Sequence, residues 1–79
     1  MISYLLIRQG GIYMYYNKLK SIRSEKGMTL EELSRKSGVS SGYLCHLENG
    51  SRTHPSIETM EKIAKALNKT IFEIFFNRQ

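Results

Sequence analysis

Apolar residues recur at helical spacing in five stretches of the chain, and residues that begin or end helices bound each stretch. Glycines close the first three stretches, at Gly27, Gly38 and Gly50. The fourth stretch carries a continuous apolar stripe, which consists of Ile57, Met60, Ile63, Ala64 and Leu67. The pattern therefore predicts an all-α fold with helices at residues 18–26, 30–36, 41–49, 57–67 and 71–76.

Hydroxyl side chains stand where four of these helices begin. Ser40, Ser56 and Thr70 are expected to cap their helices, and Thr29 is followed three residues later by Glu32, which is the spacing of a capping box. Each cap satisfies backbone N–H groups that a helix leaves unpaired. These residues therefore fix where the helices start.

The second and third predicted helices are joined by only three residues, Gly38 to Ser40. Two short helices with such a connection must cross steeply, which is the helix-turn-helix geometry. Ser41 and Gly42 are small, so the second helix of the pair can sink deep into the major groove of DNA. Tyr43 and His46 can then donate or accept hydrogen bonds there.

The chain has 79 residues, with 12 Lys and Arg against 7 Glu and no Asp, and a formal net charge of +5. This length predicts one small domain whose limited core favours a dimer partner. No apolar run approaches the ~20 residues that cross a bilayer, so we expect a soluble, cytoplasmic protein without a membrane span.

Positive charge is concentrated in residues 17–52, which contain seven basic side chains and four glutamates. The last 27 residues carry a net charge of only +1. A basic region attracts polyanions, and nucleic acid is the commonest of them in a cytosol. An acidic membrane surface is the competing partner. It is disfavoured because glycines interrupt the long amphipathic helix that such an anchor needs.

Catalytic and metal chemistry find little support in the composition. The single Cys excludes an internal disulfide, and with two His it does not show the spacing of a zinc site, so neither metal nor cofactor is expected. An enzyme is not expected, since no paired carboxylate faces a histidine and no Gly-rich phosphate loop is present. Cys45 is interpreted as a small side chain at the helix rim, and His46 as a DNA contact rather than a metal ligand.

The motifs around the predicted helix-turn-helix resemble those of the Cro/phage-repressor family of regulators, also called the Xre family. They are Leu19-x-x-Ile22-Arg23-x-x-Lys26-Gly27-Met28-Thr29-x-x-Glu32-Leu33-Ser34, Ser37-Gly38-Val39-Ser40, Tyr43-Leu44-x-x-Leu47-Glu48-Asn49-Gly50 and Pro55-Ser56. The resemblance covers residues 17–76, the predicted DNA-binding domain. Within it, Tyr43-Leu44 and Thr53-His54-Pro55-Ser56-Ile57 look most like the SinR-type repressors of Gram-positive bacteria.

The resemblance implies five helices, a homodimer and an operator in double-stranded DNA with two half-sites. By position, it assigns base reading to Ser41, Gly42 and His46. It assigns phosphate binding to Thr29, Tyr43, Asn49, Arg52 and Thr53. Tyr43 has two open interpretations, a DNA contact and simple packing against the turn. The chain departs from the family pattern in having Gly42 without a side chain to read bases, Ser34 for the usual alanine and Lys69 for a common apolar residue.

Two further pairs of residues have predicted roles. The family places Arg23 and Glu48 together as a structural ion pair between the first and third helices. Phe72 and Phe76 are surplus to a core that Ile71, Ile74 and Phe75 can supply, and surplus aromatics predict an oligomer interface. Lys62, Lys65 and Lys69 are interpreted as a solvated face.

Residues 1–16 lie outside the resemblance. Two β-prone runs flank Gln9-Gly10-Gly11, which reads as a hairpin with a glycine turn. In the alternative, these three residues can be encoded by codons that contain a ribosome-binding sequence, so that residues 1–13 are a translated leader and Met14 is the start. The N-terminal extension is thus a hairpin, a disordered segment or a leader. A secretory signal is not expected, because its basic n-region is missing.

The sequence predicts a DNA-binding transcriptional repressor that acts as a homodimer, with residues 41–49 in the major groove and no small-molecule ligand domain. The alternative is a protein-interaction module, such as an antitoxin or an anti-repressor partner, that retains the helix-turn-helix.

Overall fold

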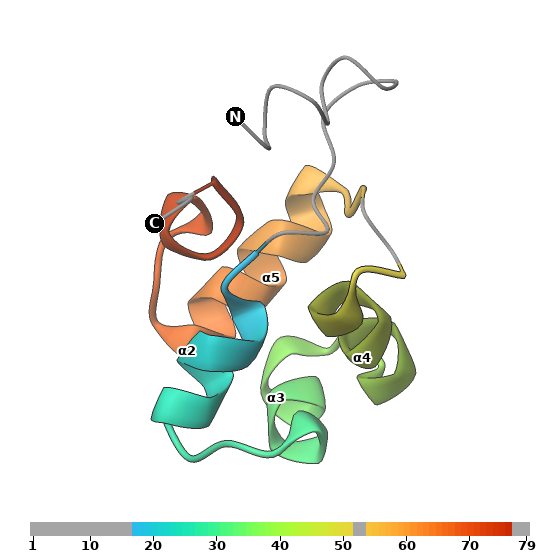
Figure 1. The fold of residues 1–79 in the computed structure, drawn as a ribbon, viewed down its shortest axis with the longest axis vertical. Coiled ribbons are helices and arrows are strands. Elements are labelled where there is room, and N and C mark those ends of the chain that lie inside the picture. Colours follow the sequence, from blue (N-terminus) through green and yellow to red (C-terminus); the bar gives the residue numbers. More distant parts are fainter. Residues whose placement is uncertain (1–16, 52–53, 77–79) are drawn as a thin grey trace.

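In the computed structural model, residues 17–51 and 54–76 are described, and they form five helical elements (Figure 1). These are α2 (Leu19–Glu25), α3 (Leu30–Ser37), α4 (Ser41–Asn49), α5 (Ile57–Leu67) and the π-helical turn η1 (Phe72–Phe76). The described residues contain no strand, which confirms the predicted all-α fold. The predicted hairpin or leader at residues 1–16 lies outside the described residues.

The predicted capping residues begin the helices. The Thr29 hydroxyl accepts the backbone N–H of Glu32 at 3.0 Å, and the Glu32 carboxylate accepts the N–H of Thr29 at 2.8 Å, which completes the capping box. Ser40 and Ser56 each accept the N–H three residues later, at 3.2 and 3.1 Å. Each bond satisfies a backbone donor that the helix cannot pair internally.

Left-handed residues end three of the helices. Gly38 and Gly50 terminate α3 and α4 with φ angles of 78° and 86°, where a side chain would be strained. Asn68 ends α5 with φ of 58°, and asparagine is the residue that tolerates this conformation best after glycine. The Gly38 N–H donates to the Ser34 carbonyl at 2.8 Å and closes α3.

The core lies where one face of each helix meets its neighbours, with α3 packed against both α4 and α5. It is a single cluster of buried side chains, made of Leu19, Ile22, Leu33, Leu44, Leu47, Met60, Ile63, Ala64, Leu67, Ile74 and Phe75. One member of the predicted apolar stripe is missing from it. Ile57 is 60% exposed, so burial along α5 begins only at Met60, one turn inside the helix.

The fifth predicted helix is present, but it is a π-helical turn and not an α-helix. Thr70 and Glu73 bond reciprocally before it, since the Glu73 carboxylate accepts the Thr70 N–H at 2.8 Å and the Thr70 hydroxyl accepts the Glu73 N–H at 3.1 Å. From Phe72 the chain then forms the π-helical turn η1. This turn buries Ile74 and Phe75 in the core.

The first and last described helices are joined directly. The backbone N–H of Lys18, just before α2, donates to the carbonyl of Ile74 in η1 at 2.8 Å. Figure 1 shows η1 beside α2 and α5, on the opposite side of the domain from α4. The position of α2 therefore depends on η1.

Candidate nucleic-acid interface

The turn between α3 and α4 is built from residues 38–40 and is held by local hydrogen bonds. Ser37 is buried, and its hydroxyl accepts the N–H of Val39 at 3.1 Å. Val39 packs against the core, and Ser40 then caps α4. The two helices leave this turn steeply inclined to each other, with α4 at the edge of the domain (Figure 1).

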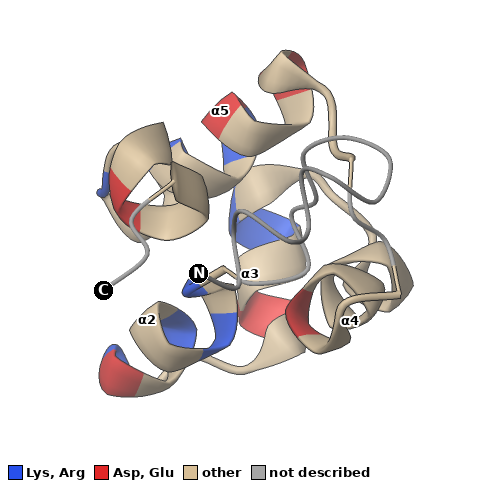
Figure 2. Ribbon diagram, turned by 45° about the horizontal axis from the view of Figure 1, so that its top comes forward, with Lys and Arg blue, Asp and Glu red and all other residues tan. Residues whose placement is uncertain are grey.

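The inner face of α4 anchors the helix and its outer face is uncharged. Leu44 and Leu47 are completely buried. The opposite face is formed by four exposed residues at spacings of three, one and three, namely Gly42, Cys45, His46 and Asn49. In Figure 2 the ribbon of α4 is tan apart from one red segment, because Glu48 is the only charged residue in it. An uncharged, small-residue face of this kind can approach another surface closely.

The predicted base-reading residues occupy two different environments. Gly42 and His46 lie on the exposed face, whereas Ser41 is only partly exposed at its flank. The structure thus brings two of the three onto one surface. Cys45, which is predicted at the helix rim, is exposed on the same face as His46.

The predicted phosphate-binding residues are distributed around this face. Thr29 is exposed at the start of α3, where its hydroxyl forms the capping box. Asn49 is exposed at the end of α4, and its side-chain oxygen accepts both the N–H and the hydroxyl of Ser51, at 3.0 and 2.8 Å. Tyr43 is partly buried and packs against the core. Arg52 and Thr53 lie outside the described residues.

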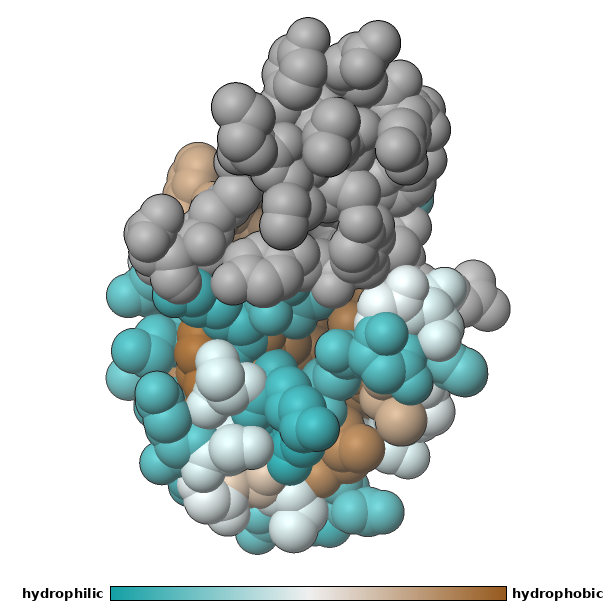
Figure 3. All heavy atoms as spheres, viewed as in Figure 1, coloured by the Kyte–Doolittle hydropathy of each residue, from teal (hydrophilic) through white to brown (hydrophobic). Residues whose placement is uncertain are grey.

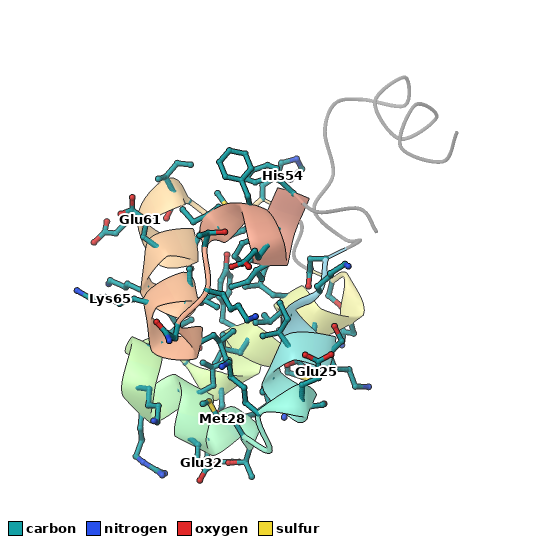
Figure 4. The ribbon with its side chains drawn as sticks, turned by 90° about the vertical axis from the view of Figure 1, so that its left-hand side faces the viewer. Glu25, Met28, Glu32, His54, Glu61 and Lys65 are labelled. Carbon is teal, nitrogen blue, oxygen red and sulfur yellow. The ribbon has the colours of Figure 1, made fainter. Side chains whose placement is uncertain are left out.

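Arg23 of α2 and Glu48 of α4 form a two-point ion pair. The Arg23 Nε lies 2.5 Å from Glu48 Oε2 and Nη2 lies 3.1 Å from Oε1, while Nη1 donates to the Met28 carbonyl at 2.6 Å. The two side chains are 14% and 7% exposed. The hydrogen bond to Glu48 raises the pKa of Arg23 above its usual value. The guanidinium therefore joins α2, the α2–α3 loop and the last turn of α4; Met28 is labelled in that loop in Figure 4.

A second attachment between α2 and α4 was not anticipated. Asn17 Nδ2 donates to the carbonyl of Leu47 at 3.1 Å, and Asn17 Oδ1 accepts the N–H of Leu19 at 2.9 Å. The one signal in the sequence was an asparagine just before a helical stretch, a residue type that favours helix starts. Asn17 and Arg23 together fix the C-terminal end of α4 against α2.

Near α4, the exposed basic side chains belong to α2, its C-terminal end and α3. They are Lys20, Lys26, Arg35 and Lys36. Arg23, by contrast, is neutralised by Glu48 and adds no charge to the surface. The blue segments of α2 and α3 in Figure 2 show that positive charge lies on the helices beside α4 and not on α4 itself.

Lysines also line the outer side of α5. Lys62, Lys65 and Lys69 are exposed, and Lys62 lies 3.7 Å from Glu58 across one helical turn. Figure 4 shows Glu61 and Lys65 projecting away from the domain. This face therefore has both signs of charge, as a solvated surface does.

Apolar residues also reach the surface at the end of the fold. Phe72 is 72% and Phe76 is 41% exposed, and their ring centroids lie 5.5 Å apart. Elsewhere, the face shown in Figure 3 has brown apolar patches that are separated by teal polar residues. The two rings of η1 thus form a small continuous apolar surface.

Residues 17–51 and 54–76 contain no group of three His, Cys, Asp or Glu side chains that could hold a metal ion. No helix within these ranges is long and apolar enough to cross a bilayer.

Comparisons with known proteins agree with this geometry. The helix-turn-helix family matches residues 19–74. The transcriptional regulator SinR of Bacillus subtilis is 38% identical over 58 residues, which are 73% of this chain and 52% of SinR. An uncharacterized helix-turn-helix regulator of Sinorhizobium fredii, y4dJ, is 42% identical over 53 residues, 67% of this chain and 68% of that protein. The chain spans about half the length of SinR.

Solved structures are similar in three dimensions as well. SinR in complex with DNA superposes with a TM-score of 0.66 at 39% identity, over 68% of this chain and 86% of that one. The restriction-modification controller protein C.AhdI of Aeromonas hydrophila has a TM-score of 0.67 at 32% identity, over 71% and 83%. A complex of SinR with the SinI protein gives 0.66 at 38% identity, over 70% and 53%.

Proposed function

The chain belongs to the Xre family of helix-turn-helix transcriptional regulators, and on that premise we propose that it represses transcription by binding a specific operator with α4 in the major groove. The observation that carries the proposal is the exposed face of α4. This face is uncharged and lined by small or polar side chains, while Leu44 and Leu47 hold the opposite face in the core. A helix of this kind fits the major groove and can read base edges there.

Within this proposal, His46 hydrogen-bonds a base edge, and Ser41 assists from the flank of the helix. Thr29 at the start of α3 and Asn49 at the end of α4 hold phosphates on either side of the groove, with Tyr43, Arg52 and Thr53 as the further phosphate contacts. The exposed basic side chains of α2 and α3 add attraction that does not depend on sequence. The proposed function involves no catalytic step.

The operator is bound by a homodimer whose interface is the Phe72–Phe76 surface. Two exposed rings, 5.5 Å apart, would be covered if a two-fold axis placed them against their copies. Such a dimer presents two α4 helices to half-sites about one DNA turn, ~34 Å, apart. Residues 17–76 form its DNA-binding domain, and residues 1–16 are an extension to it.

The same exposed rings favour a second candidate, a protein-interaction module that binds another protein through η1. SinR, one of the similar structures, was solved in complex with the SinI protein. An anti-repressor or antitoxin partner would cover Phe72 and Phe76 in place of a second copy. The two candidates differ in whether α4 contacts DNA.

Site selection from random duplex DNA, followed by a salt titration, tests the proposal. A repressor should enrich one sequence, and its affinity should fall steeply with salt as counterions are released from the phosphates. A pure interaction module should enrich nothing, and that result would reject operator binding.

Cys45 supplies an independent measurement because it is the only cysteine of the chain and is exposed on α4. The enriched duplex should slow its alkylation by a thiol reagent, whereas a scrambled duplex should protect it less. Alkylation of the urea-unfolded protein is the control, since its rate should not respond to DNA. Equal rates with and without the enriched duplex would place α4 outside the interface.

A further inference from the structure

Gly42 is the second residue of α4, and nothing in the described fold requires a glycine there. A Cβ built at this position meets no heavy atom within 4 Å among the described residues. Its backbone is helical, whereas Gly38 and Gly50 have positive φ angles at the ends of α3 and α4. Neither the space inside the domain nor the backbone conformation explains why position 42 lacks a side chain.

Glycine at position 42 also lowers the stability of the helix. Glycine in a helix is less favourable than alanine, because it loses more backbone freedom when the chain folds. An exposed helical position with open space around it would therefore be filled if stability alone decided. Gly42 lies on the same face as His46 and Asn49, so a surface that approaches this face would meet the bare backbone at position 42.

We propose that Gly42 is the point of closest approach between α4 and the bases, so that position 42 selects the operator by the space it leaves. This inference rests on the proposed DNA-binding function and adds a specificity-determining residue to it. The first turn of a recognition helix is the part that contacts base edges. Without a side chain at position 42, the helix backbone reaches the groove floor, and Ser41 and His46 come within hydrogen-bonding range on either side.

The selected base pair is one that fills this space. Thymine carries a methyl group in the major groove, and a bare helix backbone accommodates that methyl group where a side chain would collide with it. Any substitution at position 42 would hold α4 away from the groove floor. It would weaken the contacts of His46 as well, because that residue lies one turn further along the same face.

The experiment compares Gly42→Ala and Gly42→Leu with the unaltered protein, using a duplex that the unaltered protein enriches from a random pool and a scrambled duplex. Gly42→Ala should raise the Tm, because it increases helix propensity and its Cβ meets open space. It should weaken binding to the enriched duplex about tenfold or more while changing binding to the scrambled duplex less than about twofold. Gly42→Leu should weaken specific binding further.

Ser24→Ala is the matched control, because Ser24 is exposed on α2 and this change also raises helix propensity. It should leave both affinities unchanged. Full affinity of Gly42→Ala for the enriched duplex would overturn the close approach at position 42 while leaving DNA binding intact. Failure of the unaltered protein to enrich any sequence would instead overturn the DNA-binding function, and this inference with it. If Gly42→Leu does not fold, Gly42→Ala decides the question alone.

Discussion

Asn17 and Leu47 are separated by 30 positions in the sequence, yet the side-chain amide of Asn17 donates to the Leu47 carbonyl at 3.1 Å. This carbonyl lies in the last turn of α4, where the helix cannot pair all of its own acceptors. The Leu47 carbonyl also accepts the N–H of Gly50, at 3.4 Å, so Asn17 supplies its shorter hydrogen bond. The bond ties the proposed recognition helix to the start of α2.

Asn17→Asp should separate the two roles of this side chain. A carboxylate can still accept the Leu19 N–H and suits a helix start, but it cannot donate to Leu47. We expect the free energy of unfolding to fall by about 1 kcal/mol, and by more in Asn17→Ala, which loses both bonds. Chemical denaturation checks this. Equal stability of Asn17→Asp and the unaltered protein would show that the bond to Leu47 contributes nothing.

Arg23→Ala should be more damaging, because it leaves the carboxylate of Glu48 largely buried without its partner. The expected loss is about 3 kcal/mol, with a parallel loss of DNA affinity as the end of α4 is released. Arg23→Lys is the informative control. It keeps the charge, but an ammonium group cannot reproduce the planar fork that reaches Glu48 and Met28 together. An unchanged Tm in Arg23→Ala would exclude the ion pair as a structural element.

His46→Ala tests base reading. It should cost about 1–3 kcal/mol at the operator and relax the preference at one base position, because a base-edge hydrogen bond is lost. Arg52→Ala should instead weaken all DNA sequences nearly equally, as expected for a phosphate contact. Affinities across a library of operator variants distinguish the two patterns. A uniform loss in both variants would remove His46 from the base-reading residues.

Replacing Phe72 and Phe76 together by glutamate should give a folded monomer that binds half-sites weakly and loses its preference for a palindrome. Neither ring belongs to the buried core cluster, so the fold should survive their loss, whereas charges on a dimer interface would repel across the two-fold axis. Sedimentation measures the state of association. If the dimer persists, the interface lies elsewhere, and a chain that begins at Met14 then tests residues 1–13.

Glu73 predicts a response to acid. The backbone N–H of Thr70 lowers the pKa of the Glu73 carboxyl below its ordinary value of 4.5. The folded protein therefore releases this proton more readily than the unfolded chain does. The resulting stabilisation is complete above the unfolded pKa and disappears as pH falls through the lowered, folded pKa. The Tm difference between the unaltered protein and Glu73→Gln should narrow below pH 4.5, and a constant difference would contradict this.

Helix starts were the most predictable feature of the fold, because their determinants are local. Thr29 and Glu32 lie only three positions apart in the sequence, and the structure contains the capping box that they predict. Burial was less predictable. Ile57 fits the apolar period of α5 yet is exposed, because periodicity identifies a face but not how far the neighbouring helices cover it.

Long-range polar contacts could not be predicted from the sequence for a different reason. The Arg23–Glu48 pair was expected only through the family resemblance, and the Asn17–Leu47 bond was not expected at all. Every residue has a backbone carbonyl, so the sequence does not indicate which carbonyl accepts a hydrogen bond from a distant side chain. The widened turn at Phe72–Phe76 was missed for a related reason, since π-helical and α-helical turns bury similar residues.

The bond between Lys18 and Ile74 has a consequence for how the protein is made. Ribosomes release the chain from its N-terminus, so α2 and α4 emerge before η1 exists. Until Ile74 has left the ribosome, the start of α2 lacks its carbonyl partner, and the core lacks Ile74 and Phe75. The packing of α3 against α4 and α5 does not need η1. Nascent chains that stop short of η1 should therefore hold α3, α4 and α5 together but leave the start of α2 unanchored.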